Sequence, residues 1–416
     1  MNDPIKKTRH FLKKLGPGFI TGASDDDPSG ILTYLQTGVV WGTRALWTVL
    51  ITLPLMCAIQ EMCGRIGYVT RKGLIKILKE NYSRPILYFI ALISAAVIIL
   101  NIGVDLLAIG ISLENISSIN RLYWIPIMAA FILVFIIFFS FKKFTRIMKW
   151  LALSLFFYVI VVFYLKVDWS AALQSTFIPS FKWSKEIPLL LAAILGTTIS
   201  PYLFYWQTSE EMEIKKSQHT IKGATSGELA TLREDTFSGM FLSNFIMWFI
   251  ILGASQLGGL YGITEITSFE QASLVLKPLL GAWASLIFNL GIIGTGLLAI
   301  PVLASSVGYI LAETFNWKEG ISKKFWQAKS FYFSIIGATL LGILTVLINI
   351  NAIQLLIYAA LFYAIITPLL IYFIMRIAND KKIMGNKTNS KLSNIFGWLA
   401  FVIITGAVLS YFFTLI

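Results

Sequence analysis

Apolar runs of about 20 residues recur along almost the whole 416-residue sequence, and they constrain the fold more than any other feature. A run of this length crosses the hydrocarbon core of a bilayer as a helix. Hydrophobic residues make up 57% of the chain and charged residues only 13%, a composition too apolar for a soluble protein. We therefore predict an all-α polytopic membrane protein with about eleven transmembrane helices. They lie at about 17–39, 43–66, 85–113, 122–141, 146–167, 187–213, 235–257, 280–313, 329–349, 352–377 and 395–415.

The net charge of +13 is distributed unevenly along the chain. With the N-terminus in the cytoplasm, all but six of the 34 Lys and Arg residues fall in predicted cytoplasmic segments. The longest polar segment, residues 215–234, is predicted to be a cytoplasmic loop. This asymmetry satisfies the positive-inside rule, and an odd number of spans then places the C-terminus outside the cytoplasm. The charge orients a multi-pass protein in the cell (plasma) membrane and indicates no nucleic-acid partner. We expect no obligate protein partner. The six exceptions are Arg44, Arg121, Lys166, Lys182, Lys185 and Lys277.

Two of the predicted spans contain a proline break. The first breaks in GASDDDPSG, residues 22–30, where three aspartates precede Pro28, and the sixth breaks at Pro201 in TTISPYLF. Interrupted helices at the start of each of two five-helix halves are typical of secondary transporters with inverted repeats. The alternative is that each proline only kinks its helix. We favour a single membrane transport domain over 1–416. Its first repeat is about 17–167, its second about 187–377, and an extra helix lies at about 395–415.

A break beside a carboxylate offers oxygen ligands at mid-membrane. Proline removes a backbone N–H and leaves carbonyl groups unpaired, which in lipid must be satisfied by protein, water or an ion. Oxygen ligands suit Mg²⁺, Ca²⁺ or Mn²⁺ better than soft metals, and three aspartates disfavour an anionic substrate. The candidate ligands are the carbonyls around Ser24 and Thr197, the Asp27 carboxylate and the hydroxyl of Ser200 or Thr198.

Few other ionisable residues lie inside the predicted spans. Asp105 in the third span is either a proton relay or ion guide, or a carboxylate hydrogen-bonded at a helix interface. Glu61 lies four residues before Arg65, a spacing that predicts an ion pair on one helix face. The glutamates that end the sixth span form either an acidic cytoplasmic vestibule or a solvated helix end. They are Glu210, Glu211 and Glu213.

Both breaks resemble those of a known family. GPGFITGASDDDPSGILTYLQTG resembles the first helix of Nramp-type divalent-metal transporters, whose usual break reads Asp-Pro-Gly-Asn, and GTTISPYLFYWQTSEE resembles the sixth, which usually reads Met-Pro-His. IQEMCGRIGYVTRKGL is similar to the second helix, and the similarity continues to the C-terminal KLSNIFGWL. The variant breaks look like those of the divergent bacterial branch that includes Nramp-related magnesium transporters. The resemblance implies a LeuT-like fold.

The resemblance also implies a metal site. Asp27 would be the metal-binding carboxylate, with Ser24 and Thr197 as carbonyl donors. The metal-binding Asn of the family falls on Gly30 and its Met on Ser200. Loss of the thioether removes the preference for softer transition metals, and the smaller side chains widen the site for a partly hydrated Mg²⁺. We expect uptake of Mg²⁺, with Mn²⁺ also accepted, as transported substrate, and we expect no cofactor.

Proton coupling is the second point at which the chain departs from the family. The sixth-helix histidines of the family fall on Tyr202 and Gln207, which do not titrate near neutral pH. Asp105 remains from the third-helix acidic pair, whose second position is Ala108. We therefore predict alternating access with weak or absent proton coupling. Asp25 and Asp26 are candidates for charges along the ion path. Gln354 in the tenth span either approaches the ion in an occluded state or packs between helices.

Four alternatives remain at this stage. One is a conventional proton-coupled Mn²⁺ or Fe²⁺ transporter of the Nramp type. Another is an organic-solute symporter of the same fold, whose substrate carboxylate the aspartates of the first break disfavour. An intramembrane aspartyl protease needs two carboxylates that share a proton, and no Gly-Xaa-Gly-Asp segment accompanies Asp27 or Asp105. An ion channel is the last. We expect a transporter and not an enzyme.

Overall fold

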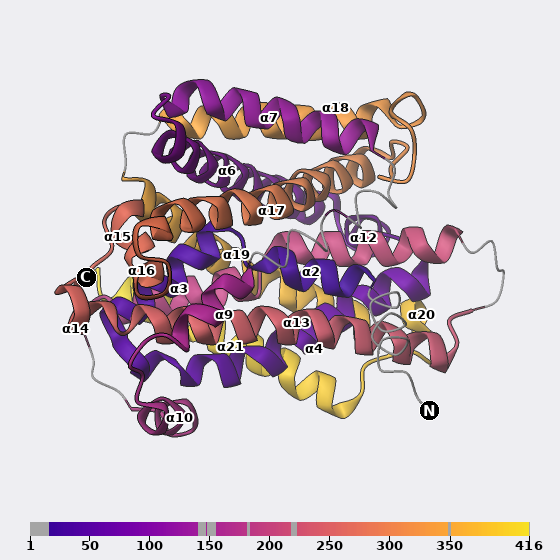
Figure 1. Cartoon of the computed structure of the whole chain (residues 1–416). Coiled ribbons are helices and arrows are strands. Elements are labelled where there is room, and N and C mark those ends of the chain that lie inside the picture. Colours follow the sequence, from indigo (N-terminus) through magenta and orange to yellow (C-terminus); the bar gives the residue numbers. More distant parts are fainter. Residues whose placement is uncertain are drawn as a thin grey trace, which may run out of the picture.

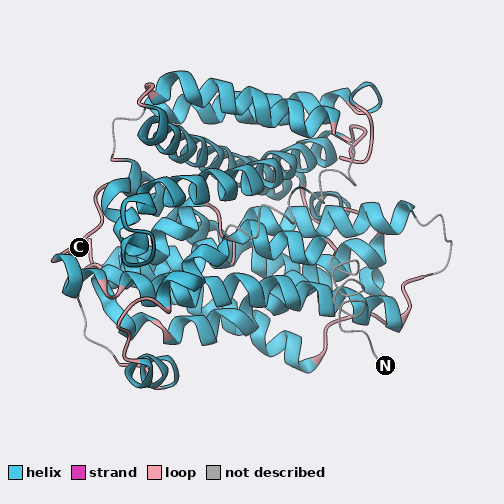
Figure 2. Cartoon of the chain, in the orientation of Figure 1, coloured by secondary structure: helices cyan, strands magenta, loops and turns pink. Residues whose placement is uncertain are grey.

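The computed structural model describes residues 16–139, 147, 155–180, 184–217, 223–347 and 351–415, and in these residues the regular structure is helical (Figure 2). Among them, eight segments are long and apolar enough to cross a membrane. The predicted all-α membrane fold is confirmed. The eight are Trp47–Thr70 (α4), Arg84–Ser117 (α6), Arg121–Phe138 (α7), Ile187–Ser217 (α11 and α12), Ser226–Tyr261 (α13 and α14), Gly281–Phe315 (ending in α17), Ala352–Asn379 (α19) and Lys391–Phe413 (α21).

The other three predicted spans are not among these eight segments. The first consists of two helices, α2 (Pro17–Asp25) and α3 (Pro28–Trp41). The ninth contains α18 (Lys329–Ile343). The fifth, 146–167, lies in large part outside the described residues, and α9 (Phe156–Val162) is the helix described within it. A total of eleven crossings therefore stays a prediction.

The expected loop at 215–234 is much shorter in the structure. Helix α12 (Pro201–Ser217) continues past the start of the predicted loop, and α13 (Ser226–Ala254) begins well before the end of that loop. A capping box explains the early start of α13, because the Thr225 hydroxyl accepts from the Glu228 N–H while the Glu228 side chain accepts from the Thr225 N–H. The prediction of a twenty-residue loop was wrong because polar residues were read as irregular structure.

The helices pack reciprocally between the two halves of the chain. In Figure 1 the long helices run roughly from left to right, with α6, α7, α17 and α18 together at the top. Helix α2 packs against α13 while α12 packs against α4, so each broken helix contacts the second span of the other half. Likewise α6 packs against α18 while α17 packs against α7. This exchange of partners is what inverted repeats produce.

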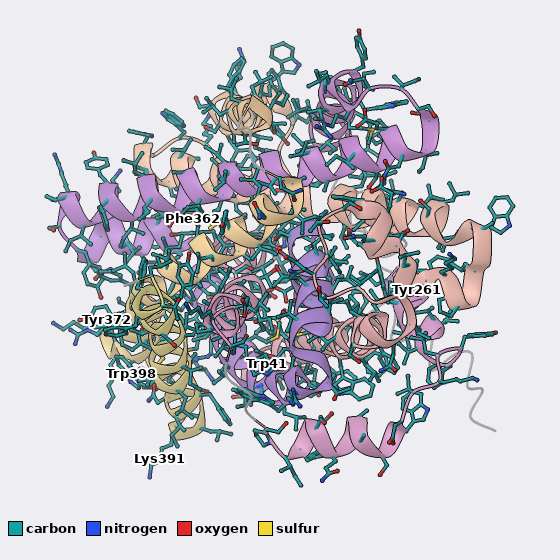
Figure 3. The ribbon with its side chains drawn as sticks, turned by 90° about the vertical axis from the view of Figure 1, so that its left-hand side faces the viewer. Trp41, Tyr261, Phe362, Tyr372, Lys391 and Trp398 are labelled. Atoms are coloured by element: carbon teal, nitrogen blue, oxygen red, sulfur yellow. The ribbon has the colours of Figure 1, made fainter. Side chains whose placement is uncertain are left out.

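Large apolar side chains cover the outside of the bundle. Figure 3 shows Phe362, Tyr372 and Trp398 on its surface, and Tyr372 and Trp398 are in ring contact between α19 and α21. In water such a surface would aggregate, whereas in a bilayer it faces lipid. The polar and charged side chains of the breaks are buried inside it.

Candidate ion-binding site

Both proline spans are broken, as the sequence predicts. Helix α2 ends at Asp25, Asp26 has neither helical nor extended backbone angles, and Asp27 is the N-cap of α3. Two residues separate the end of α11 (Ile187–Thr198) from the start of α12 at Pro201. Because α2 packs against α12 and α3 packs against α11, the two breaks lie side by side inside the bundle.

The Asp27 carboxylate is held by three donors. Its Oδ1 accepts from the Gly30 N–H at 2.6 Å and from the Ser29 hydroxyl at 2.7 Å, while its Oδ2 accepts from the Asn101 amide at 2.8 Å. The side chain is fixed and buried, with the residue 1% exposed. Asn101 comes from α6 and was missed in the sequence. A signal was available, because Asn101 lies four residues before Asp105 on the same helix face.

Hydroxyl groups occupy the two carbonyls that the resemblance named. The Tyr202 hydroxyl donates to the Ser24 carbonyl oxygen at 2.6 Å, joining the start of α12 to the end of α2. The Ser200 hydroxyl lies 2.5 Å from the Thr197 carbonyl oxygen and 3.0 Å from that of Gly196. The structure thus brings Ser24, Thr197, Ser200 and Tyr202 to the paired breaks. Each carbonyl oxygen retains a second lone pair.

Oxygen atoms crowd around Gly30. A Cβ atom at this position would lie 2.9 Å from Thr197 Oγ1, 3.2 Å from the Asp25 carbonyl oxygen and 3.4 Å from Asp27 Oδ1. The space that a larger side chain would take is therefore filled by oxygens from both breaks. We expected a wide cavity here, and in this conformation the site is instead closely packed.

The remaining aspartates of the site are also buried. Ser243 Oγ of α13 lies 2.9 Å from Asp25 Oδ2 and 3.1 Å from Asp26 Oδ1. Asp105 Oδ2 lies 3.4 Å from the Asn101 amide, so Asn101 links Asp27 and Asp105. None of the three carboxylates faces solvent in this conformation. Ser243, like Asn101, was not singled out in the sequence.

A polar seam continues from the first break along α2 and α12. The Thr21 hydroxyl donates to Gln207 Oε1 at 2.5 Å, and Gln207 Nε2 donates to Glu211 Oε1 at 3.2 Å. Glu211 also lines a cavity of about 290 Å³ beside Glu228 and Asp235. We call this chain of contacts the α2–α12 seam, and it lies at the end of the bundle where α2 begins, the Gly16 end.

The glutamates at the end of α12 have separate surroundings. Glu210 and Glu211 are buried, so a solvated helix end is the wrong reading for them. Glu213 Oε1 accepts from the Tyr309 hydroxyl at 2.6 Å and from the Ile321 N–H at 3.0 Å, which fixes the loop after α17 (Ala284–Phe315). Only Glu211 of the three is joined to the α2–α12 seam by a described hydrogen bond.

A second and larger cavity opens at the other end, where α3 finishes at Trp41. It has a volume of about 650 Å³ and is lined by residues that include Gln36, Arg44, Glu265 and Gln354. Gln354 is exposed in this cavity near the start of α19, so this conformation does not bring it to the paired breaks. Gln36 Oε1 accepts from the Ile266 N–H at 2.8 Å, which holds the loop before α15 (Phe269–Ser273) against α3.

The donors gathered at the breaks are therefore oxygen atoms of one carboxylate, of carbonyls and of hydroxyls. Within the described part of the chain there is no group of three or more His, Cys, Asp or Glu side chains placed to hold a metal ion. A cation at the breaks would depend on backbone and hydroxyl oxygens as much as on Asp27.

A sequence model of the natural resistance-associated macrophage protein-like (Nramp) family matches residues 18–414. The chain belongs to the Nramp family. Nramp proteins are membrane transporters of divalent metal ions, so this protein is a transporter and not an enzyme. The membership also sets aside the protease reading of Asp27 and Asp105.

Solved structures share the fold of this Nramp protein. A manganese transporter of Eremococcus coleocola, in complex with an aromatic bis-isothiourea compound, has a TM-score of 0.71 at 16% identity, over 95% of this chain and 85% of that one. A nucleobase-cation-symport-1 family transporter in a closed conformation has a TM-score of 0.56 at 14% identity, and the match covers 97% of this chain and 91% of that one. A Na⁺-coupled sialic acid symporter has a TM-score of 0.56 at 12% identity, and the match covers 95% of this chain and 90% of that one. These similarities confirm the LeuT-like fold.

Proposed function

We propose that this Nramp transporter carries Mg²⁺, accepts Mn²⁺, and works by alternating access with weak or absent proton coupling. The observation that carries the proposal is the set of atoms around Gly30, where Thr197 Oγ1, the Asp25 carbonyl oxygen and Asp27 Oδ1 converge. All three are oxygens, and Ser200 supplies a hydroxyl where a thioether would favour softer metals. Hard oxygen donors favour Mg²⁺.

In this proposal the ion binds between the two breaks. Asp27 supplies a charged ligand, and the Ser24 and Thr197 carbonyls supply neutral ones. The hydroxyls of Tyr202 and Ser200 satisfy these carbonyls while no ion is bound, and they turn their hydrogens away when a cation arrives. Mg²⁺ keeps several of its waters when bound, so protein oxygens need to fill only part of its octahedron.

The cavities at the two ends provide the path. The 650 Å³ cavity at the Trp41 end receives the ion, and the α2–α12 seam leads from the breaks toward the 290 Å³ cavity at the Gly16 end. Asp25 and Asp26 lie next to the breaks and lower the electrostatic cost of a divalent cation inside the membrane. The positive-inside rule makes the Gly16 end cytoplasmic, and an odd number of spans then places the C-terminus outside. Movement of the ion from the Trp41 end to the Gly16 end would be uptake across the cell membrane.

Weak coupling follows from the groups at the two former histidine positions. Tyr202 donates to the Ser24 carbonyl, and Gln207 bridges Thr21 and Glu211, so both are held in hydrogen bonds and neither titrates near neutral pH. Asp105 is buried beside Asn101 and close to the site. This carboxylate favours the second candidate, a conventional proton-coupled transporter of Mn²⁺ or Fe²⁺.

Proteoliposomes that contain a Mg²⁺ dye and a pH dye test the proposal. Asp27→Asn keeps the N-cap acceptor but removes the charge, and we expect it to abolish Mg²⁺ and Mn²⁺ uptake. Asp168→Asn is the matched control, because Asp168 caps α10 (Trp169–Phe177) through the same contact, to the N–H three residues on. Uptake by Asp27→Asn at the wild-type rate would refute the site. Lumenal acidification that follows Mg²⁺ entry would refute the coupling proposal.

A further inference from the structure

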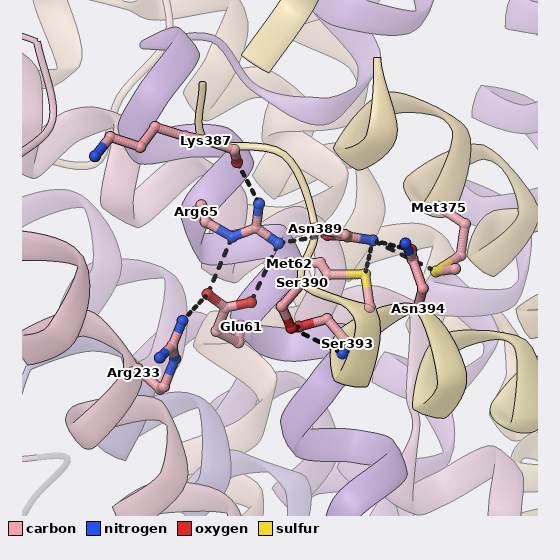
Figure 4. A network of polar contacts seen from close by, with 10 residues as sticks. All are labelled: Glu61, Met62, Arg65, Arg233, Met375, Lys387, Asn389, Ser390, Ser393 and Asn394. Atoms are coloured by element: carbon pink, nitrogen blue, oxygen red, sulfur yellow. Dashed lines mark hydrogen bonds and ion pairs between the residues drawn. The ribbon is translucent and has the colours of Figure 1, made fainter. Parts of the chain in front are cut away.

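A buried arginine organises the C-terminal part of α4. Arg65 donates through Nε to Glu61 Oε1 at 3.0 Å, which confirms the predicted ion pair (Figure 4). Its other nitrogens donate to the Lys387 carbonyl and to Asn389 Oδ1, both at 2.5 Å. These contacts bind the segment between α20 (Lys381–Met384) and α21 to α4. The residue is 4% exposed, so Arg65 is a fixed part of this structure.

Positive charge is in excess around this arginine. Glu61 Oε1 also lies 3.6 Å from Arg233 Nη2 on α13, and Lys387 Nζ donates to the Ser226 hydroxyl at 3.3 Å. Glu61 thus pairs with Arg65 and Arg233, while Lys387 contacts a neutral hydroxyl, so this group of one carboxylate and three cations carries a net charge of +2. The guanidinium of Arg233 is largely exposed, because its side chain has 67% of its surface accessible. Arg233 and Lys387 have donors to spare for an anion.

These groups surround a cavity of about 270 Å³. Hydroxyls of Ser226, Thr388 and Ser390 line it together with Arg233 and Lys387. Ser226 is the first residue of α13 and Ser390 is the N-cap of α21, so two long helices present their positive ends here. Arginine, lysine, hydroxyl groups and helix N-termini are the donors that bind phosphate oxygens.

We propose that this cavity binds the phosphate of an anionic phospholipid headgroup. It lies where α4, α13 and α21 meet at the end of their spans, which is the level of lipid headgroups. Directly beside it, α21 exposes Leu392 (61%) and Ile395 (55%), and Figure 3 shows Lys391 and Trp398 on the outside of this helix. Acyl chains would cover this apolar surface, whereas free phosphate would leave it bare. Basic pockets between spans on the cytoplasmic side are typical sites for acidic lipid headgroups.

A lipid in this position would join α13 to the segment before α21 through one headgroup. Arg233 and Lys387 come from these two parts of the chain, and Arg65 already holds the segment in place. The site is independent of the ion path, since the residues that line it are distinct from those of the paired breaks. The lipid proposal therefore stands or falls separately from the choice of transported ion.

The test compares lipids added to the purified full-length protein in a neutral detergent. Phosphatidylglycerol should raise Tm more than phosphatidylcholine does, and native mass spectrometry should show it retained. In Arg233→Gln/Lys387→Gln we expect roughly 30-fold weaker phosphatidylglycerol binding, because each basic residue near an anionic lipid contributes about 1 kcal/mol. Lys381→Gln/Lys382→Gln removes two exposed cations from neighbouring α20 and should bind phosphatidylglycerol like wild type.

Three results would overturn the proposal. The first is equal retention of phosphatidylglycerol by the Arg233/Lys387 variant and wild type. The second is equal loss in the Lys381/Lys382 control, which would mean a diffuse charge effect. The third is a Tm gain with inorganic phosphate that matches the gain with phosphatidylglycerol, which would make the ligand a free anion. The Tm of each variant in phosphatidylcholine verifies its folding.

Discussion

Tyr202 donates a hydrogen bond from its hydroxyl to the carbonyl oxygen of Ser24 across 2.6 Å, and this contact joins the two broken spans at their breaks. Both residues are buried, so the carbonyl depends on the hydroxyl when no ion is bound. The phenol therefore stabilises the empty site, and a cation that takes the same carbonyl competes with it.

Replacement of Tyr202 by phenylalanine tests this competition. Loss of the hydroxyl leaves the Ser24 carbonyl unsatisfied in the empty protein, and we expect stability to fall by about 1–3 kcal/mol. A bound cation would satisfy the carbonyl again, so Mg²⁺ or Mn²⁺ should raise Tm more in Tyr202→Phe than in wild type. Tyr205→Phe is the control, because the Tyr205 hydroxyl pairs with Ser94 instead. A smaller metal-induced gain in Tyr202→Phe would show that the hydroxyl serves the bound state.

The amide of Asn101 offers a second test, because it orients Asp27 from α6. Asn101→Ala should weaken metal binding by roughly 10- to 100-fold, the usual effect of removing a group that orients a metal ligand. Asn115→Ala is the control on the same helix, since its amide contacts Asn289 instead. Isothermal titration measures the Mn²⁺ affinity of both variants and of wild type. An Asn101→Ala protein that binds Mn²⁺ as tightly as wild type would mean that Asp27 needs no support from α6.

The sequence predicts the breaks well and their supporting side chains poorly. Pro28 and Pro201 interrupt helices for a local reason, because each lacks an N–H and clashes with the preceding turn. The Asp27 cap and the Glu61–Arg65 pair are local too, since their partners lie three and four residues away. Patterns of this kind are readable without any tertiary information.

Asn101 and Ser243 could not be predicted in the same way. Their partners are 74 and 218 residues distant in sequence, so the contacts exist only after α6 and α13 pack against the breaks. The packed surroundings of Gly30 also depend on this packing, because Thr197 comes from the other half of the chain. From the sequence, a glycine at position 30 predicts a wider ion site. Only the folded structure shows that oxygen atoms of Thr197, Asp25 and Asp27 occupy the space beside it.

Gly30 should tolerate even one added methyl group badly. A Cβ atom there would lie 2.9 Å from Thr197 Oγ1, and overpacking of this kind costs about 1–3 kcal/mol. We expect Gly30→Ala to lower both Tm and Mg²⁺ uptake. Gly337→Ala on α18 is the control, since a Cβ there would meet no atom within 4 Å.

A second substitution separates crowding from a need for flexibility at Gly30. Thr197→Ala removes the atom that the new methyl group would approach, so Gly30→Ala/Thr197→Ala should regain the Tm lost by Gly30→Ala. Differential scanning fluorimetry of the four variants gives the coupling between the two sites. Strict additivity of the two changes would contradict contact between these residues.

Glu211 is the carboxylate that the α2–α12 seam leads to, and its neutralisation should slow ion release. Asp235 in the same cavity accepts from the Gly16 and Gly18 N–H groups, and Glu228 is paired with Lys215 at 2.8 Å, whereas the described contact of Glu211 is the neutral Gln207 amide. Within the described contacts, Glu211 is thus the carboxyl group of this cavity that is hydrogen-bonded to a neutral side-chain amide, and a passing cation can pair with it. We expect Glu211→Gln to lower the maximal uptake rate by roughly 3- to 10-fold through loss of this attraction.

The affinity of the breaks for Mn²⁺ should not change in Glu211→Gln, because the Glu211 carboxylate does not touch the breaks. It contacts Gln207, and Gln207 in turn contacts Thr21 of α2. Glu228→Gln is the control in the same cavity, and its uptake rate should stay near that of wild type. Mn²⁺ titration of the purified protein and uptake into proteoliposomes measure the two quantities separately. A Glu211→Gln protein that transports at the wild-type rate would place the ion path elsewhere, and one that loses affinity instead of rate would make Glu211 part of the binding site.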